Sequence, residues 1–563
     1  MIAALFAALL APAAASDIQD YSALEAALDA ELQRSMDELV LSDQERPYLV
    51  IYDVVDGAHA TFHASFGAML TETVDPHRQL RAEVRIGSYA FDSSNFDAMG
   101  EPEGVMVTSL PLEYDERAVR RQAWLATDRA YKNAVEQYSR KRADYEPSEQ
   151  EIPDLLPIEP VTSSPISQPV VDEAQIRATV ERLSAIPAEY DGAFESGEAA
   201  GRDWQGTRLT LSSEGMRLYR TTGYALVRVE AVMRMEDGSR LRDGRWWVAR
   251  TAAELPDLAQ MEAEVREMCD WLVALQDAPV LEDYIGPVLF EAPAAVELYR
   301  QLAAPEMVGT PPLKQTMAFG DFSAGASRGR ARIGRRLMPE GWTITDDPTV
   351  PGTAGSYTYD HDGVRASAVG VVEDGVVLNL LTSRIPAGLN QPSTGHARAL
   401  GADRREAMPA VVSVTPKRTR SERRMRRKAL RLSSQTINDG VLVIRRLEPP
   451  SMTEDFDIFF TGEGPPPGLT PPYEAYMLYA DGREQPVRGV TFVGVDRRVL
   501  REVVMAGDPG EYVGVMDSSP GPRRYNIGAV GGLPAAWSVP PVLLTEIEVQ
   551  GDAGGEVREI PAP

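Results

Sequence analysis

One histidine pair in this sequence has a spacing that could bind a catalytic metal. His59 and His63 are four residues apart, which on a helix would place two imidazoles on one face. The segment alternates like a strand, however, and residues four positions apart on a strand are separated by about 13 Å. No glutamate stands between them to act as a base. We therefore interpret both histidines as strand residues and predict no metal site here.

A serine pattern offers a second possible chemistry. Residues 325–329 match G-x-S-x-G around Ser327, a pattern that in hydrolases holds a nucleophile on a turn between a strand and a helix. Here the preceding residues 319–324 are polar and contain glycine, and residues 328–332 are basic. Neither flank supplies the required element. We interpret this segment as a loop without a catalytic role.

The chain has a single cysteine, Cys269, so no disulfide within the chain and no zinc cluster built from cysteines can form. The apolar residues around it recur every three or four positions over residues 257–276, which predicts a helix with one buried face. No basic neighbour is placed to stabilise a thiolate. We expect Cys269 to be a small core residue.

Charge excludes some partners. The formal net charge is -27, and a field of that sign repels nucleic-acid phosphates and anionic lipids. Residues 417–431 are the exception, with nine basic residues. Because no aromatic residue is interleaved for stacking on bases, we predict a solvated helix face or a surface that docks an acidic partner, and no nucleic-acid partner.

The N-terminal residues predict export. A short apolar run leads into Ala13-Ala14-Ala15, a small-residue site suited to signal-peptidase cleavage after Ala15. The run is too short to anchor the chain in a bilayer, and no other stretch is long and apolar enough to span one. We expect residues 1–15 to be a signal peptide and the mature protein to be periplasmic or secreted.

The predicted elements indicate an α+β protein with two domains. Residues 16–278 form the first, an antiparallel sheet with flanking helices that is interrupted by a proline-rich excursion at residues 147–169. Its expected elements are a helix at 22–39 with a capping box of Ser22 and Glu25, strands at 48–55, 59–70 and 79–87 with a turn at Asp56-Gly57, helices at 115–145 and 172–186, and strands at 207–212, 225–235 and 245–250.

The second domain, residues 279–563, has a different texture, because glycine, proline and short β-prone runs dominate it. Two hairpins are expected. One has strands at residues 364–372 and 376–383 with a turn at 373–375, and the other has strands at 475–479 and 487–493 with a turn at 481–482. The pattern predicts a β-rich, barrel-like domain.

Nine short stretches, in order along the chain, resemble the TldD/PmbA family of metallopeptidase-related proteins, in its exported branch. They are residues 85–96 (RIGSYAFDSSNF), 121–132 (RQAWLATDRAYK), 282–291 (EDYIGPVLFE), 345–349 (TDDPT), 360–364 (DHDGV), 372–376 (VEDGV), 393–398 (STGHAR), 487–490 (VRGV) and 504–508 (VMAGD). The resemblance implies two domains, the second barrel-like. In active members it implies a zinc site made by two histidines of an H-E-x-x-x-H helix and a late cysteine, inside a dimer that degrades or trims unfolded peptides.

This sequence departs from the ligand pattern that the resemblance implies. The corresponding stretch offers Phe290, Glu291, Ala292, Ala295 and Val296, and no histidine. The late region, residues 510–522, contains no cysteine. A hydrolytic zinc needs three protein ligands, so we expect no catalytic or metal-binding residue in this chain and zinc only in an active partner.

The resemblance therefore suggests an inactive, PmbA/TldE-like subunit that dimerises with a TldD-type homologue or with itself and takes unfolded peptides. Two alternatives stay open: a stand-alone periplasmic peptide-binding protein, and a metallopeptidase whose site is not recognised in the sequence.

Overall fold

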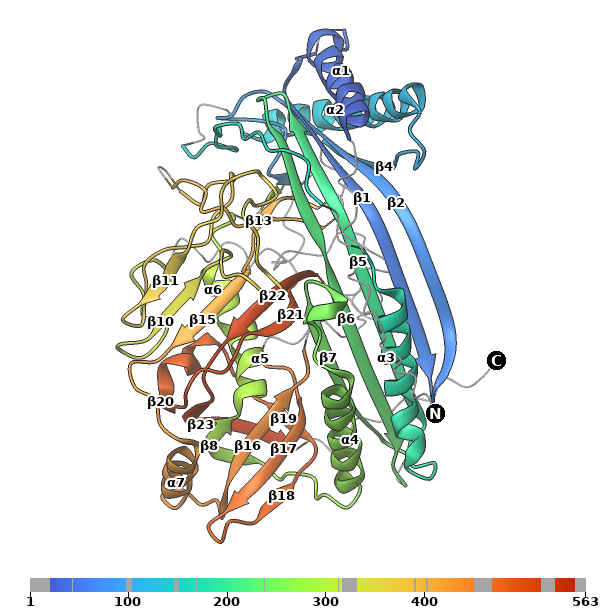
Figure 1. The fold of residues 1–563 in the computed structure, drawn as a ribbon. Coiled ribbons are helices and arrows are strands. Elements are labelled where there is room, and N and C mark those ends of the chain that lie inside the picture. The colour runs from blue at the N-terminus through green and yellow to red at the C-terminus, as the bar shows by residue number, and fades with distance from the viewer. Residues whose placement is uncertain are drawn as a thin grey trace, which may run out of the picture.

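The computed structural model describes most of the chain (Figure 1). The described residues are 21–42, 44–97, 104–145, 151–167, 170–236, 238–311, 313–315, 332–388, 391–400, 403–449, 468–517 and 532–551. The expected leader at residues 1–15 and the serine pattern at residues 325–329 lie outside them. No described helix is long and apolar enough to cross a membrane.

An antiparallel sheet of six strands dominates the N-terminal half, in the order β4-β2-β1-β5-β6-β7. Four of its strands are unusually long, at 17 to 19 residues, and run the length of the molecule (Figure 1). The strands are β1 (Pro47–Ser65), β2 (Ala68–Ile86), β4 (Val105–Ser109), β5 (Ser196–Ser212), β6 (Arg217–Arg234) and β7 (Arg240–Ala249). The expected α+β class is confirmed.

Helices cover one face of this sheet in two pairs. Side chains alternate between the faces of a strand, and the even-numbered core residues of β1 point to the helices. They are Val50, Tyr52, Val54, Ala60, Phe62 and Ala64. Near one end they pack against α1 (Ser22–Glu38) and α2 (Glu116–Asp144), and near the other against α3 (Glu173–Ala185) and α4 (Leu258–Leu275). The odd-numbered residues of β1 point to the C-terminal half.

The expected turn at Asp56-Gly57 is wrong. Strand β1 continues through it, and Gly57 pairs with His77 on one side and Gly206 on the other. A Cβ at Gly57 would lie 2.5 Å from the ring of Trp204, so glycine is needed there for close packing across strands. The chain turns instead at Phe66 and Gly67, with φ of 47° and 81°, and the expected third strand is the second half of β2.

The helices agree better with the sequence. All four were expected close to their observed bounds, and Cys269 of α4 is fully buried, as predicted. Burial raises the pKa of its thiol to about 12, with a further contribution from Asp270. The expected capping box is wrong, because the N-cap of α1 is Tyr21 and makes no side-chain cap hydrogen bond.

Two curved sheets enclose a helix in the C-terminal half, which confirms the expected barrel-like character. One has six strands in the order β12-β11-β10-β15-β22-β21, and the other has β18-β17-β16-β8-β23-β19 with β20 paired to β23. Helix α5 (Ala292–Leu302) lies between them, and one large apolar core joins all three. The predicted boundary between residues 278 and 279 stays a prediction.

The strands of the C-terminal half are short. They are β8 (Tyr284–Phe290), β10 (Thr343–Asp346), β11 (Val369–Glu373), β12 (Val376–Val377), β15 (Val411–Thr415), β16 (Gly440–Leu447), β17 (Pro472–Tyr479), β18 (Glu484–Pro486), β19 (Val490–Phe492), β20 (Val503–Ala506), β21 (Val513–Asp517), β22 (Leu533–Ser538) and β23 (Val542–Gly551). The small elements are α6 (Ala304–Met307), α7 (Glu422–Ser433), and the pairs β3 (Phe96–Asp97) with β9 (Lys314–Gln315) and β13 (Ala397–Arg398) with β14 (Glu406–Ala407).

Both expected hairpin turns exist. Asp374 and Gly375 have φ of 49° and 77° between β11 and β12, and Gly482 has φ of 88° between β17 and β18. In the second hairpin the returning strand is β18 rather than the expected residues 487–493. Part of that segment instead forms β19, which pairs with β23.

Candidate functional site

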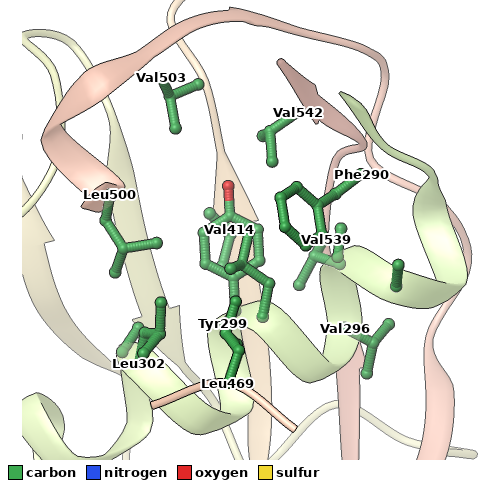
Figure 2. Packing of buried hydrophobic residues seen from close by; sticks show 14 of the residues in the cluster. Phe290, Val296, Tyr299, Leu302, Val414, Leu469, Leu500, Val503, Val539 and Val542 are labelled. Atoms are coloured by element: carbon green, nitrogen blue, oxygen red, sulfur yellow. The ribbon is translucent and has the colours of Figure 1, made fainter. Parts of the chain in front are cut away.

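The positions where the family resemblance implies metal ligands lie at the junction of β8 and α5. Phe290 ends β8 and is fully buried in the C-terminal core together with Val296 and Tyr299 of α5 (Figure 2). Ala295 is also fully buried, and Ala292 is half-buried. Apolar side chains thus occupy four of the five named positions, and they pack against the sheets.

Glu291 is the one polar residue of that set, and its charge is balanced by neighbours. It occupies the N-cap position of α5 without capping the helix with its side chain. Its carboxylate accepts hydrogen bonds from the Tyr476 hydroxyl at 2.7 Å and from Arg426 at 3.1 Å, and Arg445 approaches to 3.4 Å. Two guanidiniums and a phenol therefore fix Glu291 between α7, β16 and β17.

A buried ionic cluster that the sequence did not predict lies farther along α5. Arg300 donates from Nε to Asp517 Oδ1 at 2.8 Å and from Nη2 to the carbonyl oxygen of Met516 at 2.6 Å, and it also pairs with Glu297. Trp537 completes the cluster by donating to Asp517 Oδ2 at 3.1 Å. Asp517 belongs to the late region, residues 510–522, whose remaining residues 518–522 lie outside the described chain.

The charged groups of this cluster stabilise one another. Burial lowers the pKa of Arg300, but Glu297 and Asp517 outweigh it and raise that pKa above its ordinary value. Burial raises the pKa of Glu297 and Arg300 opposes the shift. The only advance signal was the spacing of Glu297 and Arg300, three residues apart in the stretch where the family resemblance implies a helix. Within the described ranges, no group of three histidine, cysteine, aspartate or glutamate side chains is arranged to hold a metal ion.

A second candidate site is a cavity of about 960 Å³ between the N-terminal sheet and the C-terminal half. Its floor is the sheet face opposite the helices, where odd-numbered residues of β1 such as Asp53 and His59 point. Its roof consists of loops around residues 348–366 and 398–400 and the start of β22. This volume is at the upper end of the range typical of small-molecule sites.

Arginines dominate the polar lining of the cavity. Asp53 accepts a hydrogen bond from Arg405 and lies 3.9 Å from Arg81 and 4.0 Å from Arg208. Burial raises the pKa of Asp53, but Arg405, Arg208 and Arg81 more than reverse this and hold it well below its ordinary value. Arg220 spans floor and roof, because it donates to Thr210 Oγ1 at 2.9 Å and to the carbonyl oxygens of the roof loop.

A neutral histidine faces the same cavity. The main-chain nitrogen of Ala399 donates to His361 Nδ1 at 3.0 Å. Burial, followed by Arg208 and Arg220, holds the pKa of His361 well below its ordinary value. Since Nδ1 is the acceptor in this neutral ring, Nε2 carries the proton and is a donor. Sequence reasoning gave His361 no role.

Three stacked rings form another part of the floor. His59 stacks on His77 and on Trp204, with ring centroids 4.5 Å apart in both pairs. Burial lowers the pKa of His59 to about 4, with His77 contributing, and burial also lowers the pKa of His77. His63 lies farther along β1 and contacts Glu198 at 3.2 Å. The interpretation of His59 and His63 as strand residues is confirmed.

Residues 422–431 of the basic segment form most of α7, and residues 417–421 precede the helix. Met425 and Ala429 are buried against the outer face of the second C-terminal sheet, and Arg426 pairs with Glu291, Glu422 and Glu484. Part of the basic charge therefore has acidic partners within the chain. The expected absence of a nucleic-acid partner stays a prediction.

Comparisons with known proteins agree on one class. Residues 287–456 match the family model described as the PmbA/TldA metallopeptidase C-terminal domain. A metalloprotease of Methanothermobacter thermautotrophicus is 46% identical over 69 residues, 12% of this chain and 15% of the relative. The metalloprotease slr0863 of Synechocystis is 26% identical over 226 residues, 40% of this chain and 44% of the relative. Each alignment thus spans less than half of the curated relative.

Solved structures share the fold along nearly the whole chain. TldE from Thermococcus kodakarensis has 13% identity and a TM-score of 0.60 over 94% of this chain and 100% of its own. A Thermotoga maritima protein described as a modulator of a DNA gyrase has 14% identity and a TM-score of 0.61 over 93% and 100%. The chain thus resembles metallopeptidase-related proteins in residues 287–456 and shares its overall fold with the solved structures. Together the comparisons support the TldD/PmbA family for this chain.

Proposed function

We propose that this chain is a non-catalytic member of the TldD/PmbA family that assembles with an active zinc peptidase and helps to handle its peptide substrates. One observation carries the proposal. Where α5 meets the late region, the guanidinium of Arg300 is bound by Glu297 and Asp517. A fixed cation between two carboxylates repels a metal ion and uses the carboxylates that could hold one.

The chemistry of the neighbouring positions supports the same proposal. Phe290, Ala295 and Val296 present no lone pair to a metal, and Glu291 is held by Arg426 and Arg445. A hydrolytic zinc must be held by three protein ligands while it lowers the pKa of its bound water. In this proposal the zinc and its ligands belong to the partner, and this chain contributes its surface and its cavity.

Co-purification from the native host tests the assembly. The chain carries a C-terminal tag, and the eluate is analysed by mass spectrometry, size-exclusion chromatography and metal analysis. We expect a homologue with an H-E-x-x-x-H helix to co-elute and to carry the zinc, and chelator-sensitive peptide hydrolysis to require that homologue. A tagged chain that elutes alone with one zinc per chain and hydrolyses peptides would refute the proposal.

A second candidate function is stand-alone peptide binding, which the size of the cavity favours. A cavity of about 960 Å³ accommodates a short peptide within one chain. The same co-purification separates the two: a chain that elutes without a homologue, free of zinc and loaded with peptides, supports this function instead.

We propose further that the protein is exported and matures by cleavage after Ala15. The support is the apolar leader that ends in three small residues. N-terminal sequencing of the mature protein from fractionated cells tests this. Recovery of an intact Met1 in the cytoplasmic fraction would contradict it.

A further inference from the structure

The cavity between the two halves has a charge opposite to that of the protein. The whole chain has 84 acidic and 57 basic residues, whereas the described lining of the cavity contains six arginines and a single carboxylate, that of Asp53. The arginines are Arg81, Arg208, Arg220, Arg250, Arg365 and Arg398. Because a concave site with low-dielectric walls concentrates this field, the cavity attracts anions.

Most of these arginines already have hydrogen-bond or ion-pair partners within the chain. Arg81 pairs with Glu83 at 2.6 Å, Arg250 pairs with Glu254, and Arg398 donates to two main-chain carbonyl oxygens. Arg220 donates to Thr210 and to the roof loop. Arg208 and Arg365 are the exceptions, since no close side-chain partner is described for either. Arg365 is exposed. The side chain of Arg208 is only 15% exposed, and its one described carboxylate contact is Asp53 at 4.0 Å.

Two of the cations also face each other. Arg208 of β5 lies directly across from Arg220 of β6 in the sheet register, and like charges in such a pair are destabilising. The Nε atoms of both are buried without a hydrogen-bond partner among the described residues. Burial and then Arg220 lower the pKa of Arg208 to about 10, although Asp53 opposes this. A guanidinium keeps its proton in a protein, so an anion relieves this repulsion.

The donors around Arg208 suit a carboxylate. A guanidinium binds a carboxylate through two parallel hydrogen bonds, and His361, which lines the same cavity, adds a neutral N–H. Of the two guanidiniums in the described lining that have no close partner, that of Arg208 is largely shielded from solvent and that of Arg365 is exposed. The single shielded guanidinium matches one monovalent group better than a divalent phosphate. The remaining walls contain the rings of His59, Trp204 and Tyr224, which suit the apolar and amide groups of a peptide.

We propose that this cavity binds a short peptide by its carboxylate, with Arg208 as the principal anchor and Arg220 and His361 as supporting donors. The inference rests on the proposed peptide-handling function and names the chemical group that the site recognises. The peptide is held between the N-terminal sheet and the roof loops.

Binding of a matched peptide pair tests the proposal. The probe is an N-terminally fluorescent hexapeptide of alanine, leucine and glycine, with either a free C-terminal carboxylate or a C-terminal amide. Binding to the full chain is measured by fluorescence polarisation in a buffer free of carboxylates and phosphate. We expect the free acid to bind about 10- to 100-fold more tightly than the amide, and inorganic phosphate to compete more weakly than acetate.

Two variants locate the anchor. Arg208→Gln removes the proposed anchor, and we expect it to abolish the preference for the free acid. Arg250→Gln removes the same charge from the same cavity, but from an arginine already paired with Glu254, and we expect it to keep the preference. If Arg208→Gln does not fold, the comparison of the two peptides on the wild-type chain decides the question by itself.

Several results would overturn the inference. Equal binding of acid and amide would show that the carboxylate is not recognised, and stronger competition by phosphate would assign the cavity to a different anion. Loss of the preference in both variants would show a general field rather than an anchor. None of these results affects whether a zinc-containing homologue co-purifies, so the failure of this inference is distinguishable from the failure of the proposed assembly.

Discussion

Two arginines at the centre of the two candidate sites are buried in opposite circumstances. Arg300 on α5 has two carboxylates, Glu297 and Asp517, and a main-chain carbonyl oxygen within hydrogen-bonding distance. Arg208 on β5 has one carboxylate at 4.0 Å, which it shares with Arg81 and Arg405. The Asp517 pair of Arg300 is 2.7 Å long. The charge of Arg300 is therefore fully neutralised by its partners, whereas that of Arg208 is not.

This difference separates a structural ion cluster from a binding site. Removing one partner of a balanced buried cluster leaves an uncompensated charge in a low-dielectric core, which is strongly destabilising. A buried cation without a close carboxylate already destabilises the folded state in this way, and binding of an external anion reduces the destabilisation. Removing the arginine should therefore have opposite consequences for stability at the two positions.

The largest expected effect is the loss of the balanced arginine. Arg300→Met leaves Glu297 and Asp517 buried without their cation, and we expect the free energy of unfolding to fall by about 3–5 kcal/mol. Urea denaturation followed by tryptophan fluorescence measures it. Adding Glu297→Gln to Arg300→Met should restore part of the loss, because it removes one of the stranded charges. A loss below about 1 kcal/mol would show that the cluster is solvated.

The histidine stack in the cavity gives the next largest effect. The pKa of His59 is about 4 in the fold and about 6.5 in the unfolded chain. Between these values the unfolded state binds more protons, so stability falls as the pH is lowered from about 6.5 to 4, by on the order of 2 kcal/mol. His59→Phe keeps a ring in the stack and should flatten this slope.

The matched control for that measurement is His63→Phe, because His63 lies on the same strand outside the ring stack and contacts Glu198. It should leave the pH dependence of unfolding between pH 6.5 and 4 as it is in the wild-type chain. An unchanged slope in His59→Phe would assign the acid sensitivity to other groups.

A smaller effect of opposite sign is expected for the unbalanced arginine. Arg208→Gln removes the repulsion with Arg220, and in the absence of ligand we expect the free energy of unfolding to stay the same or to rise by up to about 1 kcal/mol. The same urea titration measures it beside Arg300→Met. A loss comparable to that of Arg300→Met would eliminate the contrast between the two sites.

The smallest expected effect is that of a chelator. The guanidinium of Arg300 already neutralises the carboxylates of Glu297 and Asp517, so these carboxylates do not need a metal ion. We therefore expect the purified chain to contain well under one equivalent of zinc and to keep its melting temperature in EDTA. Elemental analysis and differential scanning fluorimetry measure the two quantities. A chelator-induced drop of several degrees would indicate a structural metal.

Local patterns predicted much of the fold. The helices were expected correctly because an apolar residue every three or four positions reports on its own segment, as at Cys269. The turn expected at Asp56-Gly57 failed for the opposite reason. Glycine there makes room for the ring of Trp204 on a neighbouring strand, and that pairing is decided by the register of the whole sheet.

The sites were less accessible to prediction, because their members come from distant segments. Phe290, Glu291 and Val296 could be placed near the start of α5, but the residue of that helix that bonds to the late region is Arg300. Helix packing, and not residue type, selects it. Arg208 and His361 meet only because the roof loops fold over the N-terminal sheet, and no spacing in the sequence reports that contact.

The length of β1 has a consequence for how the N-terminal half unfolds. Its residues Val50 and Tyr52 belong to the apolar core under α1 and α2, while Ala60 and Phe62 belong to the separate core under α3 and α4. Both cores share β1, β2, β5 and β6, whose ladders run through the region between them. Melting either core therefore frays strands that the other one needs. The amide hydrogens of these four strands are expected to exchange as one cooperative unit.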